Sequence, residues 1–170
     1  VDVRISASYK MADVERGQVD VAVRYTSRDT APAGAICLFG EEVMPICSPA
    51  LMRENARALR SLQDLAAHTL LHLDSAAGIL DWDTWLVAEG LADLRPAGSL
   101  SFDNYEQIVR AALDGQGVAL GIRRFVQHLV DDGQLVVPFG ATMVSQRAYL
   151  VVRSPMSRDA AHVDEFIAWL

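Results

Sequence analysis

Residues 103–121 have the sequence DNYEQIVRAALDGQGVALG, and this stretch decides the fold class. Asp103 and Glu106 have the spacing of a capping box, so a helix is expected to begin here. The glycines at 115 and 117 end the helix, and residues 118–121 follow as a short buried strand. The apolar residues of the helix recur on one face; they are Tyr105, Ile108, Val109 and Ala112.

The same alternation of helix and strand extends outward in both directions. It predicts an α/β fold with a largely parallel sheet. The chain has 170 residues, of which 51% are hydrophobic, which fits one domain or two small lobes that share a core. Strands are expected at residues 1–7, 19–25, 36–39, 43–47, 69–73, 99–102 and 147–152, and helices at residues 81–90, 123–130 and 160–170.

Charge and composition limit the classes of partner. The chain has 22 acidic and 15 basic side chains and a net charge of -7, so it is a poor match for the phosphates of nucleic acids. Its apolar runs are far shorter than the roughly 20 residues that a membrane-spanning helix needs. Cys37 and Cys47 lack the spacing of a disulfide framework or a zinc site, which favours a reduced, cytoplasmic protein. Residues 1–7 alternate apolar and polar without an initial Met, so we interpret the chain as a fragment of a longer protein.

The sequence contains no pattern typical of catalysis. Neither a G-x-S-x-G nor an S-x-x-K motif is present, and no H-E-x-x-H motif indicates zinc. Gly115, Gly117 and Gly121 resemble a dinucleotide loop, but they follow a helix and enter a strand, which is the reverse order. We favour the interpretation that these glycines end the helix and allow close packing over a direct role in ligand binding. Glu41 and Glu42 are expected to be solvated residues of a turn. We therefore expect no catalytic residue, no metal and no cofactor.

Arg24 is a candidate for binding an anion. It follows an apolar run in the strand expected at residues 19–25, where an unpaired charge is costly. Ligands of open α/β sheets gather at the carboxyl ends of the strands, so Arg24 and Tyr25 are placed to hold a small anion. A salt bridge between Arg24 and a neighbouring carboxylate is an equal alternative.

Two helix starts carry further candidates. Asp103 and Asn104 precede backbone N–H groups that can receive a ligand carboxylate, although capping by Asp103 is favoured. Asp81 is expected to cap the helix that contains Trp82 and Trp85. These two tryptophans are expected to pack on one helical face rather than to stack on a ligand.

Seven segments together resemble the effector-binding domain of LysR-type transcriptional regulators, in the branch of glycine-cleavage activators and β-lactamase inducers. They occur in the order typical of the family and span nearly the whole chain. They are DVAVR (residues 20–24), PICSP (45–49), LLH (70–72), WDTW (82–85), GQGVALG (115–121), GQLVVPF (133–139) and FIAWL (166–170).

The resemblance implies a periplasmic-binding-protein type II fold, in which two Rossmann-like lobes are joined by two crossing segments and enclose a cleft. Lobe I would comprise residues 1–42 and 148–170, and lobe II residues 43–147. The first strand and helix of lobe I, and a winged helix-turn-helix that precedes them in the family, would be missing from this chain.

The resemblance also implies a function. The domain would bind a small metabolite, polar or anionic, in the inter-lobe cleft and so control DNA binding by the missing domain. It would form homo-oligomers, with the strand at residues 1–7 and the helix at residues 123–130 as contributors, and it would not associate with a membrane. A solute-binding protein or a non-regulatory enzyme on the same fold remains an alternative. The expected effector contacts follow predicted strands or begin predicted helices; they are Ser8, Arg24, Tyr25, Asp74, Trp82, Asp103 and Asn104.

Overall fold

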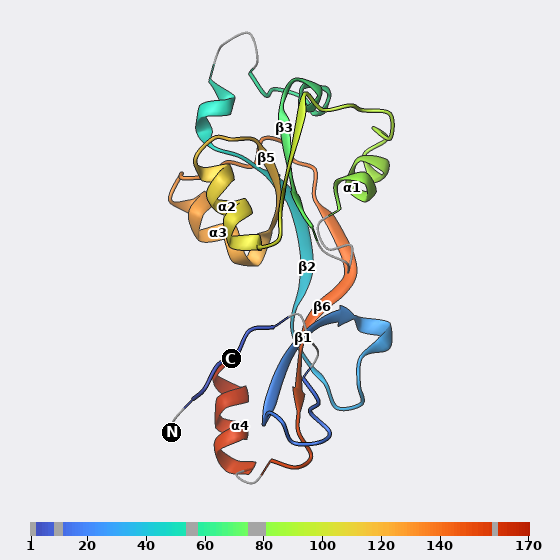
Figure 1. Ribbon diagram of the computed structural model, residues 1–170, viewed down its shortest axis with the longest axis vertical. Coiled ribbons are helices and arrows are strands. Elements are labelled where there is room, and N and C mark those ends of the chain that lie inside the picture. Colours follow the sequence, from blue (N-terminus) through green and yellow to red (C-terminus); the bar gives the residue numbers. More distant parts are fainter. Residues whose placement is uncertain (1–2, 9–11, 54–57, 75–80, 158–159) are drawn as a thin grey trace. The chain divides into compact units, whose positions relative to one another are not determined.

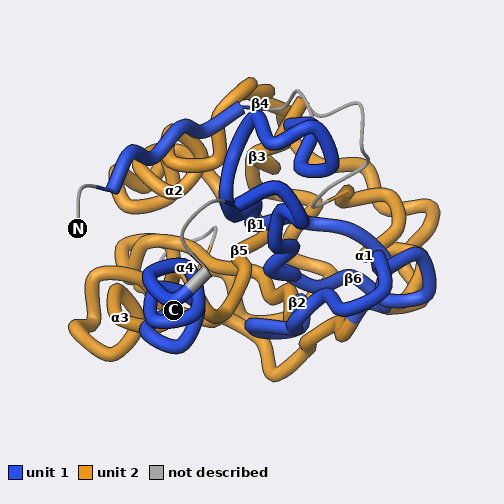
Figure 2. Tube along the Cα trace, turned by 90° about the horizontal axis from the view of Figure 1, so that it is seen from below, with its two compact units in different colours: residues 1–41, 145–170 blue, residues 42–144 orange. Residues whose placement is uncertain are grey.

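The computed structural model describes residues 3–8, 12–53, 58–74, 81–157 and 160–170 (Figure 1). The chain divides into two compact units (Figure 2): unit 1 comprises residues 1–41 and 145–170, and unit 2 comprises residues 42–144. Both divisions lie within three residues of the lobe boundaries expected after residues 42 and 147. Each unit has its own part of the sheet.

Unit 2 is built on a mixed sheet. Its strand order is β2 (Ile36–Ile46), β5 (Val118–Ile122), β3 (Thr69–Leu73) and β4 (Gly98–Phe102), of which β2 begins in unit 1. β3 runs parallel to β4 and β5, whereas β2 pairs antiparallel with β5. The helical segments of this unit are η2 (Pro49–Met52), η3 (Leu62–Ala67), α1 (Trp82–Ala88), α2 (Tyr105–Leu113) and α3 (Arg123–Asp131).

The helix and strand expected at residues 103–121 are confirmed as α2 and β5. The N-cap of α2 is Asn104, whose Oδ1 accepts a hydrogen bond from the Glu106 N–H at 2.8 Å. The prediction that Asp103 is the cap was therefore wrong by one residue. Gly115 ends the helix with a φ of 74°, a conformation that glycine adopts without strain. The Asp81 cap of α1 is confirmed, since its carboxylate accepts from the N–H groups of Asp83 and Thr84.

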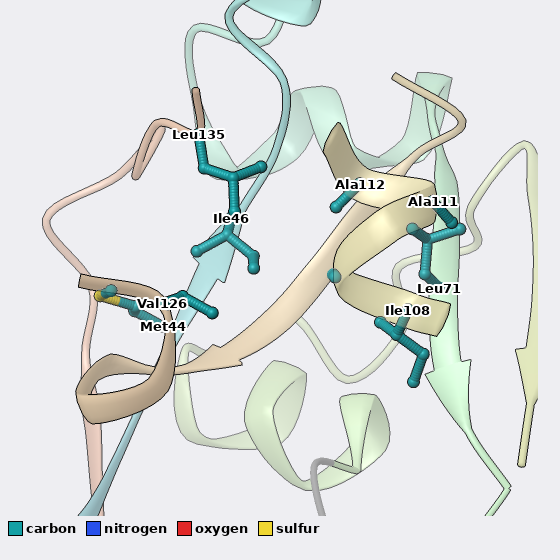
Figure 3. Close-up of a cluster of buried hydrophobic side chains, with 9 residues drawn as sticks. Met44, Ile46, Leu71, Ile108, Ala111, Ala112, Val126 and Leu135 are labelled. Atoms are coloured by element: carbon teal, nitrogen blue, oxygen red, sulfur yellow. The ribbon is translucent and has the colours of Figure 1, made fainter. Parts of the chain in front are cut away.

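The core of unit 2 lies between β5 and the helices that pack on it (Figure 3). Its side chains are almost fully buried, and burial of a Leu or Ile side chain contributes about 1.5–3 kcal/mol each. The members are Met44, Ile46, Leu71, Ile108, Ala111, Ala112, Ala119, Val126 and Leu135.

Unit 1 has a smaller sheet in the order β1 (Val21–Ser27), β6 (Met143–Arg153) and β2. β1 pairs antiparallel with β6 over its whole length, from Val21 opposite Arg153 to Ser27 opposite Arg147. The remaining helical segments of this unit are η1 (Arg28–Thr30) and α4 (Ala160–Trp169). An ion pair of 2.6 Å between Arg153 and Asp164 connects β6 with α4.

Two expectations about strands and their pairing were also wrong. Residues 3–8 form no strand and are all exposed; Ile5, for example, is 85% exposed. Alternation specifies which side chains share a face, but a strand also needs a neighbour for its backbone hydrogen bonds. The sheet is also mixed rather than largely parallel, because β1–β6 and β2–β5 are antiparallel pairs. No helix within the described ranges is both long enough and apolar enough to span a bilayer.

Candidate functional site

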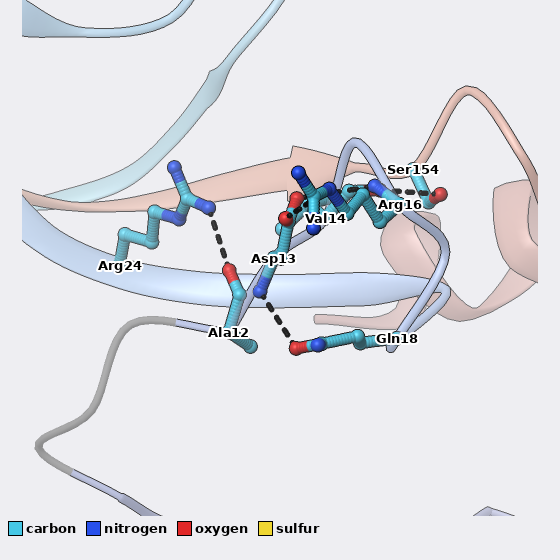
Figure 4. Close-up of polar contacts among 7 residues, drawn as sticks. All are labelled: Ala12, Asp13, Val14, Arg16, Gln18, Arg24 and Ser154. Atoms are coloured by element: carbon cyan, nitrogen blue, oxygen red, sulfur yellow. Dashed lines mark hydrogen bonds and ion pairs between the residues drawn. The ribbon is translucent and has the colours of Figure 1, made fainter.

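Arg24 lies near the middle of β1, on the sheet face that it shares with Leu150 and Val152 of β6. Its Nη2 donates to the backbone oxygen of Ala12 at 3.0 Å (Figure 4). Its Nε is buried and has no acceptor among the described residues. Arg24 forms no ion pair with any described residue, so the salt bridge considered from the sequence is not observed. Its guanidinium instead donates to a backbone carbonyl, that of Ala12.

The Arg24 side chain lines a pocket of about 350 Å³ that lies wholly within unit 1. This volume is near the lower end of the range for small-molecule sites, about 300–1,000 Å³. The lining residues come from the segment before β1, from β1 itself, from the loop after η1 and from β6. They are Ala12, Asp13, Val14, Glu15, Arg24, Pro32 and Val152.

Hydrogen bonds fix the segment that forms one wall of this pocket. The Ser154 hydroxyl is 1% exposed and donates to the backbone oxygen of Val14 at 2.7 Å. The Asp13 N–H donates to Gln18 Oε1 at 3.1 Å, and Asp13 Oδ1 accepts from the Arg16 N–H at 3.1 Å (Figure 4). Asp13 also forms an ion pair with Arg16 at 3.3 Å. These contacts connect the wall to its own turn and to Ser154, which follows β6.

The pocket contains both signs of charge. Arg24 contributes one positive charge, and Asp13 and Glu15 each contribute a negative one. The carboxylate of Asp13 is partly neutralised by Arg16, whereas Glu15 is exposed. The remaining lining side chains are apolar. Chemically, such a pocket can accept a small molecule that has an anionic group, a cationic group and an apolar part.

Tyr25 lies on the opposite face of the same strand. Its hydroxyl donates to Glu41 Oε1 at 2.5 Å, and the Ser145 hydroxyl donates to Glu41 Oε2, also at 2.5 Å. Glu41 is only 4% exposed, so the expectation that it is a solvated turn residue was wrong. Burial and the hydrogen bond to Glu41 raise the pKa of Tyr25 well above its ordinary value.

Aromatic rings cover this second face. The Tyr149 ring lies 5.0 Å from the Tyr25 ring and 4.8 Å from the Phe39 ring, and the Arg147 guanidinium is 5.2 Å from the centroid of Tyr25. Burial, followed by the charge of Glu41, raises the pKa of Tyr149 to about 12. Arg24 and Tyr25 were proposed from the sequence as partners in one site. Because neighbours on a strand point to opposite faces, the structure gives each of them different surroundings.

In unit 2 the predicted residues form a second group. Asp74 and Asp103 follow the neighbouring parallel strands β3 and β4 directly, and the Asp74 N–H donates to the backbone oxygen of Phe102 at 2.7 Å. Both aspartates and Asn104 are exposed. Within the described ranges, no group of three or more His, Cys, Asp or Glu side chains is arranged to hold a metal ion. The three residues thus follow the carboxyl ends of two neighbouring strands, and the Asn104 Oδ1 is engaged in capping α2.

The remaining two predicted contacts lie elsewhere. Trp82 is 0% exposed, its Nε1 donates to the backbone oxygen of Leu71 at 3.0 Å, and its ring meets that of Trp85 edge-on. The packing role favoured from the sequence is thus what the structure shows for Trp82. Ser8 is exposed in unit 1, and its contact with a ligand stays a prediction.

Sequence reasoning missed Asp13, Glu15, Glu41 and Ser145. Asp13 and Glu15 alternate with apolar residues in a short turn, a pattern that also describes many solvated segments. Glu41 meets partners that are 16 and 104 residues away in the sequence, so no local signal could have identified its burial.

Comparison with known proteins identifies the family of this chain. The family model described as "LysR substrate binding domain" matches residues 1–170. The "Glycine cleavage system transcriptional activator" of Escherichia coli (strain K12) is 32% identical over 170 residues, which are 100% of this chain and 54% of the relative. The "HTH-type transcriptional activator AmpR" of Rhodobacter capsulatus is 29% identical over 170 residues and 56% of its length. The chain therefore spans about half the length of the curated relatives that it matches.

Solved structures agree with this placement. The effector domain of the transcriptional regulator AmpR of Pseudomonas aeruginosa is 25% identical and superposes with a TM-score of 0.72, covering 99% of this chain and 78% of that one. An effector binding domain from Citrobacter freundii with three substitutions gives a TM-score of 0.76 at 24% identity, covering 99% and 82% of the two chains. The likeness confirms the predicted α/β fold of the periplasmic-binding-protein type II kind.

Proposed function

Because the chain belongs to the LysR substrate-binding domain family, we propose that it is the regulatory domain through which a longer transcriptional regulator senses a small, polar or anionic molecule. Ligand binding by this domain controls how a DNA-binding part elsewhere in the full-length protein acts on transcription. The single observation that carries the proposal is the family match over all 170 residues.

The net charge of the chain supports a role in ligand binding rather than in DNA contact. With a net charge of -7, the chain is repelled by the phosphate backbone rather than attracted to it. Its relatives are transcriptional regulators and not enzymes. The domain thus acts by binding alone, in the cytoplasm, where a transcriptional regulator meets its DNA.

Two groups of side chains are offered as ligand contacts. The first is Arg24 and the pocket of unit 1. Ser8 and Tyr25 are proposed as contacts from the same unit that lie outside the lining of this pocket. The second is the group Asp74, Asp103 and Asn104, which follow the carboxyl ends of β3 and β4. Trp82 contributes as a buried support for β3, because its indole N–H holds the backbone of Leu71.

Self-association through this domain is the second part of the proposal, since LysR regulators are oligomeric. The helix expected at residues 123–130 is present as α3, and its Phe125 side chain is 38% exposed. An exposed aromatic ring on a helix is suited to an interface. Phe125→Asp is expected to lower the association constant measured by sedimentation, because it places a charge at the exposed ring position. Equal association of the folded variant and the unaltered chain would contradict this role.

A ligand screen tests the sensing function. Thermal shift of the purified chain against a library of charged and polar metabolites is expected to identify at least one molecule that raises the melting temperature. Isothermal titration of each hit then gives its affinity and stoichiometry. A library of amino acids, organic acids and nucleotides in which nothing raises the melting temperature would contradict the proposal.

A further inference from the structure

We infer that the pocket of unit 1 is a site for a small zwitterion, a molecule with one carboxylate and one ammonium group on a short apolar body. This inference deepens the proposed function and rests on it. All of the residues that line the pocket belong to unit 1.

The Arg24 guanidinium has hydrogen-bond donors that the described residues do not satisfy. The group has five N–H donors, and one hydrogen bond, to the backbone oxygen of Ala12, is found among the described residues. The Nε donor is buried without an acceptor, an arrangement that is costly and uncommon in folded proteins. A planar carboxylate is the acceptor that fits a guanidinium in shape and charge. A carboxylate entering the pocket, with a small rotation of the Arg24 side chain, would supply the missing acceptors.

The other charged residues that line the pocket are acidic. Two carboxylates, of Asp13 and Glu15, share the pocket with one guanidinium. They repel a dianion such as phosphate and leave a simple monocarboxylate close to uncompensated negative charge. A ligand that carries its own ammonium group removes this repulsion. Because Asp13 is already paired with Arg16, the exposed Glu15 is the better partner for the ammonium.

The size and the apolar walls of the pocket also limit the ligand. A volume of about 350 Å³ suits a ligand of the size of an amino acid better than a nucleotide. The apolar walls come from Ala12, Val14, Pro32 and Val152, which match a short aliphatic group. Valine therefore has the charges and the body that this pocket selects, and it serves as a probe of the chemistry.

Three matched probes separate the contributions. L-valine carries both charges, 3-methylbutanoate lacks the ammonium group, and isobutylamine lacks the carboxylate. Binding is followed by the shifts of backbone amide signals in ¹H–¹⁵N correlation spectra of the whole chain. We expect saturable shifts at residues 12–15, 24 and 152 with valine, binding of 3-methylbutanoate weaker by about two- to fivefold, as for an exposed ion pair, and no saturable shifts with isobutylamine.

Variants assign the contacts to side chains. Arg24→Ala is expected to weaken valine binding roughly ten- to a hundredfold, and Arg24→Lys is expected not to restore it. Arg28→Ala, which removes an exposed arginine of the same unit that does not line the pocket, is the matched control and should bind valine as the unaltered chain does. Glu15→Gln is expected to abolish the preference for valine over 3-methylbutanoate.

Each contrary result overturns the inference. Such results are the absence of saturable shifts with valine, shifts confined to other residues, equal affinity for valine and 3-methylbutanoate, or unchanged affinity in a folded Arg24→Ala variant. The metabolite screen distinguishes this failure from that of the proposed function. A screened metabolite that binds the Arg24→Ala variant as tightly as the unaltered chain leaves the regulator function intact and places its site elsewhere.

Discussion

The phenolic hydroxyl of Tyr25 donates to the buried carboxylate of Glu41 at 2.5 Å, and this contact joins β1 to the end of the unit 1 part of β2. The hydroxyl of Ser145, the first residue of β6 within unit 1, donates to the other oxygen of the same carboxylate. Glu41 and Ser145 are thus the boundary residues at which the chain leaves and re-enters unit 1. A buried carboxylate here connects three neighbouring strands.

Loss of either hydroxyl should therefore lower the stability of the chain. Hydrogen bonds to charged groups contribute about 1.5–3 kcal/mol, and a hydroxyl that is removed leaves one carboxylate oxygen without its donor. We expect Tyr25→Phe and Ser145→Ala each to lower the free energy of unfolding by about 1.5–3 kcal/mol, measured by urea denaturation. Ser99→Ala, on the exposed surface of β4, is the control and should change it by less than about 0.5 kcal/mol. Equal stabilities of all three variants would show that Glu41 does not depend on these donors.

Stability should also fall at high pH. The pKa of Tyr149 is raised to about 12 from an ordinary value of 10.0, and the pKa of Tyr25 is raised as well. Between pH 10.0 and about 12 the unfolded chain has lost protons that the folded chain keeps, so the free energy of unfolding decreases with rising pH. Below pH 10.0 this contribution is fully present.

Tyrosinate absorbance and urea denaturation across that pH range measure the effect. Tyr149→Phe should remove one absorbance step near pH 12 and flatten the fall in stability. A Tyr149 that ionises like a free tyrosine in the folded chain would contradict the expectation.

The two tryptophans of α1 allow one hydrogen bond to be measured. Both are 0% exposed, but Trp82 Nε1 donates to Leu71 whereas Trp85 Nε1 has no acceptor among the described residues. Replacement by Phe creates a cavity at both positions and breaks a hydrogen bond only at Trp82. We expect Trp82→Phe to be less stable than Trp85→Phe by about 1–3 kcal/mol in chemical denaturation, because the backbone oxygen of Leu71 loses the indole N–H as a donor. The opposite order would refute this account of Trp82.

Gly117 should not tolerate a side chain. A Cβ at this position would lie 2.4 Å from the backbone oxygen of Thr69, which belongs to the paired strand β3. Since backbone cannot move aside cheaply, Gly117→Ala is expected to lower the melting temperature by at least several degrees. Gly140→Ala, where no atom lies within 4 Å and φ is not positive, is the control and should melt close to the unaltered chain. A Gly117→Ala variant that melts with the control would exclude close packing as the reason for this glycine.

Local patterns sufficed for the elements whose signals are local. The helix at residues 105–113 and the strand at residues 118–122 were predicted from apolar periodicity, an Asx cap and glycines at the helix end. The cap was misplaced by one residue because Asp103 and Asn104 have equivalent side-chain acceptors, and only the backbone path selects between them. The family itself was predicted from the order of seven short segments and is confirmed by the match over the whole chain.

Features that depend on contacts between residues far apart in the sequence could not be predicted from local patterns. The alternation of residues 1–7 predicted a strand, yet residues 3–8 are exposed and form no strand. The burial of Glu41 depends on Ser145, which lies 104 residues away. Arg24 and Tyr25 were predicted to share one ligand, although period-2 geometry places adjacent strand residues on opposite faces. Their contact with a ligand stays a prediction.

Unit 1 is built from two separate segments of the chain, so it cannot be completed until both have been synthesised. Its residues are divided between 1–41 and 145–170, and β1 pairs with β6, which is synthesised after every other strand that the structure describes. Unit 2 is a single continuous segment, so all of its residues emerge before the second part of unit 1 exists. Domains fold as units in the order in which they are synthesised, at about 5–20 residues per second. Arg24 and the pocket that it lines are therefore begun early but acquire their final surroundings only after β6 has been synthesised, so the nascent chain cannot sense a ligand at Arg24 before then.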